Sequence, residues 1–205
     1  MAKKQHTLDV KDRILNASRE LFVQHGYNGT SIRDIATASD TNIAHVKYYF
    51  QSKNKLFEQI FDEAFDILVN RVFSILNSDL SFSEMLESWI NAYYEILPEY
   101  PQIPIFILNE LNHNSEHLIA LVKKHEPEEI FVKITEKLAV EVKKGNIKEI
   151  SSIDFCLNVI SLAVFPFILE GIVIKVANIS SADYHAVLQR HKKLVIHFIT
   201  AALKP

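Results

Sequence analysis

The chain has 205 residues, of which 48% are hydrophobic and 23% are charged, and these ordinary globular values exclude disorder as its main state. Four glycines and six prolines are too few for a collagen-like or linker-rich chain, and they disfavour an all-β fold, which needs many tight turns. A net charge of −3 argues against a protein that coats nucleic acid with its whole surface.

The charge is distributed unevenly along the chain. Residues 1–60 hold nine Lys/Arg and six Asp/Glu, whereas residues 61–205 hold thirteen and nineteen, so a basic segment precedes an acidic body. This distribution is typical of a small DNA-reading module joined to a different domain. The single cysteine excludes an intrachain disulfide, and the charged N-terminal stretch does not look like a signal peptide, so the cytoplasm is the expected compartment.

The first 50 residues are predicted to form three helices. Apolar residues at three- and four-residue steps indicate a helix over 9–26. Thr30 or Ser31 offers the N-cap of a short second helix, with Asp34 as a possible capping-box partner of Ser31. The turn-prone stretch 39–42 then separates this helix from a second short one.

Two short helices joined by a tight turn and flanked by longer helices are the arrangement of a helix-turn-helix DNA reader. Ala36 supplies the small residue needed where the short helices cross, and Val46 and Phe50 contribute to a small core. The opposite face of the second short helix is then free to enter a major groove. Its polar, cationic and aromatic residues suit base edges and phosphates.

The stretch 14–56 resembles the TetR family of bacterial transcriptional regulators. The matching elements are Ile14-Leu15-x-Ala17-x-x-x-Leu21-Phe22-x-x-x-Gly26-Tyr27, Thr30-Ser31-Ile32-x-x-Ile35-Ala36 and Val46-x-x-Tyr49-Phe50-x-Ser52-Lys53-x-x-Leu56. The sequence departs from the family pattern at Asp40-Thr41-Asn42, where Gly-Val-Ser is usual, and at Lys47, where a tyrosine is usual. Asp40 can adopt a left-handed turn conformation and Asn42 can cap the next helix, so these departures concern the operator sequence more than the activity.

The resemblance implies DNA contacts by position. Thr30 or Ser31, Tyr49 and Lys53 would contact phosphates, and the start of the third helix would face bases or sugars. The residues expected to contact DNA are Thr30, Ser31, Asn42, Ile43, Ala44, His45, Lys47, Tyr48, Tyr49 and Lys53. Lys3 and Lys4 are expected to form an arm that adds salt-dependent affinity.

The rest of the chain is predicted to form further helices with short connections. They are expected over 52–76, 82–97, 105–112, 127–145, 152–178 and 183–203, and 113–125 forms either another helix or a loop with one turn. The predicted fold is therefore all-α with about nine helices. It comprises an N-terminal helix-turn-helix DNA-binding domain at 1–52 and a larger ligand-binding and dimerisation domain at 53–205.

The stretch 155–169 holds no charged residue. It is shorter than the roughly 18 apolar residues of a transmembrane helix, and Asn158 and Pro166 weaken that interpretation, so no membrane contact is predicted. A helix that is apolar nearly all round must be buried on both sides. The family resemblance implies that the last two helices pair with their copies in a homodimer, through candidates Phe155, Val159, Leu162, Phe165, Leu169, Val187, Leu194 and Phe198.

The resemblance also implies a small-molecule pocket in the C-terminal domain. The expected lining residues are Phe61, Phe65, Trp89, Tyr93, Phe106, Asn109 and Phe131. Aromatic rings with a few polar groups suit a small organic ligand, but an aromatic stripe at helical spacing is also typical of an ordinary core. A ligand that binds the DNA-free form better than the DNA-bound form would release the protein from DNA.

No catalytic or cofactor site is predicted, since the sequence has no glycine-rich phosphate loop, no nucleophile elbow and no paired CxxC motif. Glu110, His113 and His117 share one helical face and could hold a transition metal. A polar surface segment explains the same residues, so no metal site is predicted. Cys156 is expected to be an inert buried thiol.

The sequence therefore predicts a cytoplasmic, homodimeric regulator that is not an enzyme. It is expected to bind a palindromic double-stranded DNA operator and to act as a repressor that an unknown small molecule releases. The alternative is a helical small-molecule or metal-binding protein without specific DNA recognition.

Overall fold

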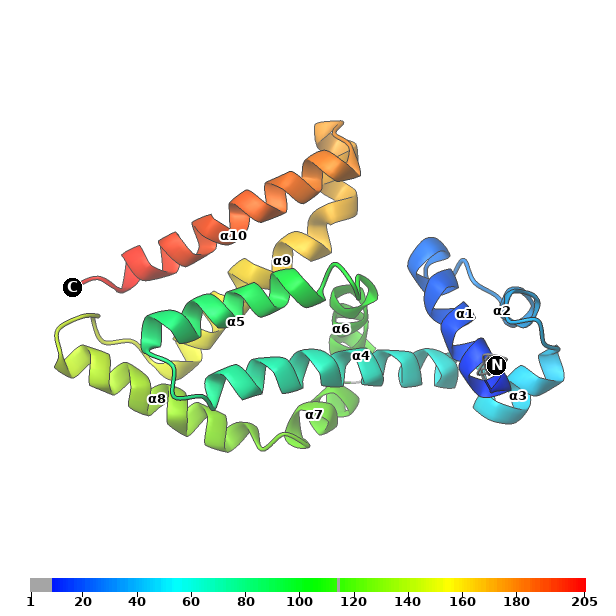
Figure 1. Ribbon diagram of the computed structural model, residues 1–205, viewed down its shortest axis with the longest axis horizontal. Helices are drawn as coiled ribbons and strands as arrows, with labels where there is room; N and C mark the ends of the chain where they lie inside the picture. Colours follow the sequence, from blue (N-terminus) through cyan, green and yellow to red (C-terminus); the bar gives the residue numbers. More distant parts are fainter. Residues whose placement is uncertain (1–8, 114) are drawn as a thin grey trace, which may run out of the picture. The chain divides into compact units, whose positions relative to one another are not determined.

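The computed structural model describes residues 9–113 and 115–205, apart from the side chains at 105, 109, 112 and 113. The described residues form ten α-helices and no β-strand, which confirms the all-α prediction (Figure 1). The helices are α1 (Val10–His25), α2 (Ile32–Ala38), α3 (Ile43–Phe50), α4 (Lys53–Leu76), α5 (Phe82–Ile96), α6 (Gln102–His113), α7 (Ser115–Lys123), α8 (Pro127–Lys143), α9 (Ser152–Ala177) and α10 (Ser181–Leu203). The stretch that the sequence left open between helix and loop forms α7.

The chain divides into two compact units, Met1–Ala64 and Phe65–Pro205. The boundary predicted after residue 52 lies earlier than this division. The reason is that Leu56 and Ile60, in the first turns of α4, are buried in the core of the first unit. The long helix α4 therefore begins in one unit and ends in the other.

The first unit has a small apolar core built from the helix-turn-helix segment. Its buried members are Ile14, Leu15, Phe22, Ile35, Ala36, Val46, Phe50, Leu56 and Ile60. Ala36, which is 4% exposed, lies on α2, the helix that packs against both α1 and α3. Because this core uses only one side of α3, the other side of that helix remains exposed.

Side chains at the helix ends hold α2 and α3 in place. Ser31 Oγ accepts a hydrogen bond from the Asp34 amide at 3.2 Å, and the Asp34 carboxylate accepts one from the Ser31 amide at 2.8 Å, which confirms the predicted capping box. The side chain of Ser31 and then its amide, both of which hydrogen-bond the Asp34 carboxylate, hold the pKa of Asp34 below its usual range. Asn42 caps α3 by accepting the His45 amide at 2.8 Å, and Asp40 has φ 50°, the left-handed turn conformation expected from the sequence.

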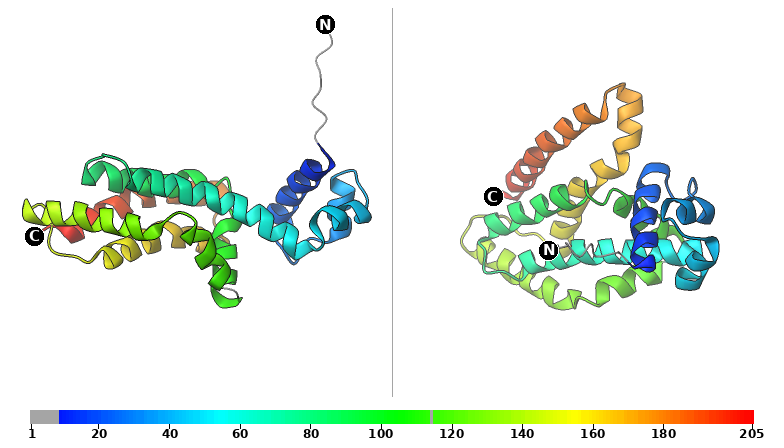
Figure 2. Two further views of the ribbon diagram at one scale, coloured as in Figure 1. Left: turned by 90° about the horizontal axis from the view of Figure 1, so that it is seen from below. Right: turned by 45° about the vertical axis from the view of Figure 1, so that its right-hand side comes forward.

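The second unit is a helical bundle in which α5 packs against α8, α9 and α10. In the right-hand view of Figure 2, α10 turns back from the end of α9, and the two helices are in contact. Tyr184 of α10 donates a hydrogen bond to the carbonyl of Pro166 at 2.7 Å, which ties α10 to the middle of α9. Figure 1 shows α9 in yellow to orange and α10 in orange to red.

Helix α9 is long and apolar enough to cross a membrane by length and composition alone, with a mean hydropathy of 2.2 in its most apolar window. The uncharged stretch 155–169, which alone is too short to span a membrane, is therefore part of a 26-residue apolar helix. Only 17% of that window is buried within the described part of the chain. An apolar helix left so exposed needs a cover from outside the chain.

Candidate nucleic-acid interface and ligand cavity

The outer face of α3 is the candidate nucleic-acid interface. Val46 and Phe50 point into the core at 1% and 4% exposure, whereas all other residues of this helix are exposed. The exposed set comprises Ile43, Ala44, His45, Lys47, Tyr48 and Tyr49. A helix with this composition on its free face presents hydrogen-bonding, cationic and aromatic groups to a groove or a phosphate backbone.

Tyr48 is the most prominent of these side chains, with 80% of its surface exposed. Its ring lies edge-on to that of Tyr49, with 5.1 Å between the ring centroids, and Tyr49 in turn lies beside Phe50. Tyr49 is 37% exposed. The rings of Phe50, Tyr49 and Tyr48 therefore follow one another from the core to the surface, and Tyr49 packs against the exposed Tyr48.

Thr30 does not have the exposed position expected of a phosphate contact. It is 2% exposed, and its hydroxyl lies within hydrogen-bonding distance of the carbonyls of Leu21 at 3.2 Å and Gly26 at 2.9 Å. This hydroxyl closes the loop after α1. Of the two predicted alternatives, only Ser31 is exposed at the start of α2.

Lys53 is also engaged inside the first unit. Its ammonium group donates to the carbonyls of Tyr27 at 2.9 Å and Thr30 at 3.1 Å, and it lies 3.9 Å from the centroid of the Tyr27 ring. These contacts satisfy the charge with backbone oxygens and a π face. Lys53 therefore positions the loop between α1 and α2, and the expected phosphate contact does not match this geometry.

Two other cations of the first unit are exposed, and neither makes a side-chain hydrogen bond or a salt bridge with the described residues. Lys47 lies on α3, and Arg33 lies on α2. Arg33 was not among the residues expected to contact DNA, although a cation near the start of the first short helix was a usable signal. Lys3 and Lys4, the expected arm, lie outside the described residues.

The second unit contains an apolar cavity of about 320 Å³. It is lined by Phe65, Leu68, Val69, Val72, Phe73, Leu76, Trp89, Tyr93, Leu97, Ile107, Leu118, Val122, Pro127, Ile130, Phe131, Ile134, Cys156, Ile160 and Val164. Four of the predicted pocket residues, Phe65, Trp89, Tyr93 and Phe131, belong to this lining. Its volume lies at the lower end of the range typical of ligand pockets.

The other predicted pocket residues do not line this cavity. Phe61 is 1% exposed and belongs to the first unit. Phe106 is 3% exposed, and its ring meets the imidazole of His117 edge-on at 6.4 Å between centroids. The side chain of Asn109 lies outside the described part of the structure. The aliphatic majority of the lining was not predicted, because Leu, Ile and Val at helical spacing look the same in a core and in a cavity wall.

Three lining groups carry a polar atom, and two of them are bonded to each other. Trp89 Nε1 donates a hydrogen bond to the hydroxyl of Tyr93 at 3.1 Å, one turn along α5. Burial raises the pKa of Tyr93 above its usual range and that of the Cys156 thiol to about 11. Both groups are therefore uncharged at neutral pH, and Cys156 has the inert character expected of it.

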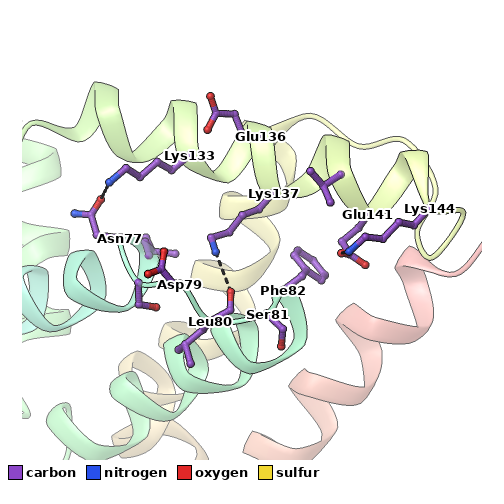
Figure 3. A pocket seen from close by; sticks show the side chains of 13 residues that line it. Asn77, Asp79, Leu80, Ser81, Phe82, Lys133, Glu136, Lys137, Glu141 and Lys144 are labelled. Atoms are coloured by element: carbon purple, nitrogen blue, oxygen red, sulfur yellow. Dashed lines mark hydrogen bonds and ion pairs between the residues drawn. The ribbon is translucent and has the colours of Figure 1, made fainter.

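A second hollow lies on the surface between α8 and the connection from α4 to α5 (Figure 3). Three lysines line it, but each of them is paired. Lys133 donates to Asn77 Oδ1 at 2.6 Å, Lys137 to the carbonyl of Leu80 at 2.9 Å and Lys144 to Glu141 at 2.9 Å. Lys133 and Lys137 thus join α8 to the neighbouring connection, and Lys144 pairs within the end of α8. Because all three cations are already paired, this hollow has a structural role.

The predicted dimer candidates separate into buried and exposed residues. Phe155 and Val159 are 0% exposed, and the Phe155 ring packs against those of Phe82 and Trp89, so both residues belong to the core of their own chain. Leu162, Phe165, Leu194 and Phe198 are exposed, and Leu169 and Val187 are half-buried. The exposed members are accompanied on α9 by Ile153, Leu157, Ile160, Ile172 and Val176, which the sequence analysis missed.

The His117 imidazole pairs with Glu110 through Nδ1 at 2.9 Å, and Glu110 is 6% exposed. The side chain of His113 lies outside the described part of the structure. Among the described residues, no group of three or more His, Cys, Asp or Glu side chains is placed to hold a metal ion.

Residues 14–60 match the model of the family described as bacterial regulatory proteins, tetR family. The chain is 30% identical over 111 residues to the probable HTH-type transcriptional regulator YttP of Bacillus subtilis (strain 168). This aligned region covers 53% of each protein. It is 32% identical over 91 residues to the biofilm operon icaADBC HTH-type negative transcriptional regulator IcaR of Staphylococcus aureus (strain Newman), covering 44% of this chain and 45% of that one. The chain thus spans about half the length of the curated relatives it matches.

The fold as a whole is also found among solved structures. The transcriptional regulator FadR from Bacillus subtilis, in complex with stearoyl-CoA, has a TM-score of 0.64 to this structure at 15% sequence identity. The match covers 94% of this chain and 99% of that chain. Both units of the chain therefore have counterparts in a known regulator fold.

Proposed function

We propose that the chain, whose residues 14–60 match the tetR family model and whose fold is similar to that of FadR, is a TetR-family ligand-responsive DNA-binding transcriptional repressor. The observation that carries the proposal is the exposed face of α3. This helix is capped by Asn42, anchored by Val46 and Phe50, and presents Lys47 and Tyr48 outward. Such a face matches the recognition helix of a helix-turn-helix module.

Within this proposal, α3 enters the major groove and the surrounding residues fix its register. Asn42, Ile43, Ala44 and His45 contact bases or sugars, and Ser31, Lys47, Tyr48 and Tyr49 contact the backbone or base edges. A bidentate or well-packed base contact is worth about 1–3 kcal/mol of discrimination, whereas a lysine on a phosphate adds salt-dependent affinity. The name of IcaR as a negative regulator supports repression as the direction of control.

The proposed functional unit is a homodimer that binds a palindromic operator. Leu162, Phe165 and Ile172 on α9, with Leu194 and Phe198 on α10, leave apolar surface uncovered in a single chain. A second copy that covers this surface removes it from water, and a two-fold pair of recognition helices suits half-sites about 34–36 Å apart. This arrangement also accounts for the exposed apolar length of α9 in a cytoplasmic protein.

The proposed effector binds in the apolar cavity of the second unit. Six residues of α4 line this cavity, and the same helix supplies Leu56 and Ile60 to the core of the DNA-binding unit. A ligand that binds the DNA-free form more tightly shifts the population away from DNA. The stearoyl chain of the ligand in the FadR complex supports an effector with a long hydrocarbon part, which suits the apolar lining of this cavity.

DNA binding is tested by fluorescence anisotropy with fragments from the region around the protein's own gene, across a series of salt concentrations. We expect specific binding to a palindromic fragment that weakens steeply with salt. Tyr48→Ala is expected to weaken this binding about tenfold, the size of one lost base or backbone contact. Lys47→Ala is expected to weaken it and to reduce the salt dependence, and Lys11→Ala on α1 serves as the matched control for a lost lysine.

Equal affinity of the wild type, Tyr48→Ala and Lys47→Ala for every fragment would contradict the role of α3. If a selection from genomic fragments also yielded no specific site, the protein would instead be a helical small-molecule binder. The metal-binding alternative has its own test, which is a thermal shift with Zn²⁺ that disappears in His117→Ala.

A further inference from the structure

The cavity of the second unit has no charged side chain in its lining. None of its nineteen lining residues is Asp, Glu, Lys, Arg or His. An ionised ligand that entered it would lose its hydration without gaining a counter-charge, which costs several kcal/mol. The walls therefore select against carboxylates, phosphates and ammonium groups.

One polar group in the wall has an unused hydrogen. The hydroxyl of Tyr93 accepts the hydrogen bond from Trp89 Nε1 at 3.1 Å, and Tyr93 is only 6% exposed. A tyrosine hydroxyl can accept and donate at the same time, and this one has no acceptor among the described residues. Since burial raises its pKa, the hydroxyl keeps its proton at neutral pH.

We propose that the cavity takes an uncharged, mostly hydrocarbon molecule with one hydrogen-bond acceptor, such as a carbonyl oxygen, which receives the Tyr93 hydroxyl hydrogen. The walls supply the affinity by removing apolar surface from water, and Tyr93 supplies the orientation. The Trp89–Tyr93 bond strengthens this donor, because a hydroxyl that accepts a hydrogen bond donates a stronger one. The role of this molecule as the effector rests on the proposed function.

Trp89 makes occupancy measurable, because it is the only tryptophan of the chain and it lines the cavity. The probes are methyl ketones from hexanone to dodecanone and the sodium salts of the fatty acids of the same chain lengths. Tryptophan emission and the melting temperature of the full chain are recorded at neutral pH. We expect the best ketone to bind at least about a hundredfold more tightly than its carboxylate partner, given the cost of burying an unpaired charge.

Two tyrosine variants separate the donor from the general packing. Tyr93→Phe is expected to weaken the best ketone about fivefold, the effect of one lost neutral hydrogen bond. Tyr94→Phe is the matched control, because Tyr94 is equally buried but its hydroxyl pairs with His191 outside the cavity. The infrared carbonyl band of the bound ketone provides a second readout, which is expected to lie at lower frequency in the wild type than in Tyr93→Phe.

The cavity itself is tested with Val72→Phe, which places a ring among the lining residues. This variant is expected to fold and to lose the ketone. The proposal is overturned if no ketone binds, if a carboxylate binds as tightly as its ketone, or if Tyr93→Phe changes neither the affinity nor the carbonyl band.

Adding the best ketone to the protein–DNA complex separates this inference from the proposed function. Release of DNA by the ketone supports both. Binding to the cavity without release of DNA supports the ligand class and contradicts its role as the effector. Release by a carboxylate, but not by any ketone, contradicts the ligand class and leaves the repressor proposal standing.

Discussion

The hydroxyl of Tyr94 lies 2.8 Å from Nδ1 of His191, and this bond joins α5 to α10 inside the second unit. Burial raises the pKa of Tyr94 to about 12 and lowers the pKa of His191 below its ordinary value of 6.5. Near neutral pH both groups are therefore uncharged, and the ring nitrogen that carries the imidazole hydrogen decides which of them donates. Protonation of His191 would place a positive charge in this half-buried site, which burial disfavours.

This pair predicts that the protein loses stability in mildly acidic solution. Because the folded pKa of His191 is lowered, the unfolded chain binds the proton first, and stability falls as the pH drops below about 6.5. His191→Gln is expected to show a smaller fall in melting temperature between pH 7 and about 5.5, since glutamine does not titrate. The comparison is made by circular dichroism, and parallel curves for the two proteins would contradict the prediction.

Lys53→Met is expected to destabilise the first unit without changing the number of phosphate contacts. Removal of the two hydrogen bonds to the loop carbonyls costs about 1–3 kcal/mol in the free energy of unfolding, measured by urea titration. The plot of log affinity for DNA against log salt keeps its slope. Lys47→Met has the opposite profile, with near-normal stability and a slope smaller by about 0.9.

The matched control for both variants is Lys55→Met, since Lys55 is exposed and makes only a surface pair with Glu58 at 3.2 Å. Its stability is expected to change by less than about 1 kcal/mol. A reduced salt slope in Lys53→Met would mean that Lys53 leaves the loop and contacts a phosphate when DNA is bound.

Asp40→Gly is expected to keep or raise the stability of the helix-turn-helix unit. Asp40 has φ 50°, which is in the left-handed region. This backbone conformation costs a residue with a Cβ atom about 1–2 kcal/mol, whereas glycine adopts it without that cost. The hydrogen bond from Arg13 to the backbone carbonyl of Asp40 at 3.2 Å survives the change. The ion pair between Arg13 and the fully exposed Asp40 carboxylate at 3.5 Å is lost, but an exposed pair contributes little to stability. Asp40→Val is the contrasting variant and is expected to lose stability in thermal melts, because a β-branched side chain does not tolerate this turn.

Phe165→Asp and Phe198→Asp are expected to prevent dimerisation while leaving each chain folded. Both side chains are more than half exposed in a single chain, so charge there does not disturb its core. Val132→Asp, at an equally exposed apolar position on α8, is the control and is expected to remain dimeric. Sedimentation velocity measures the mass, and a dimer that persists in both variants would show that a different surface joins the copies.

Local features of the fold could be read from the sequence because their partners are close in the chain. Ser31 and Asp34 are three residues apart, and Asn42 caps the amide of His45 at the same spacing. The left-handed turn at Asp40 likewise follows from a few neighbouring residues. Hydrogen-bond geometry and helical period determine such features without help from the rest of the molecule.

Tertiary packing alone decided the roles of Lys53 and Phe155. Lys53 finds its carbonyl partners 23 and 26 residues earlier, so the loop satisfies a cation that looked free for phosphate. Phe155 is apolar and periodic like Phe165, but one is fully buried and the other is 53% exposed. Hydrophobic periodicity shows how apolar each helix face is. The packing of the other helices then determines whether an apolar face lies in the core, lines a cavity or stays exposed to a second chain.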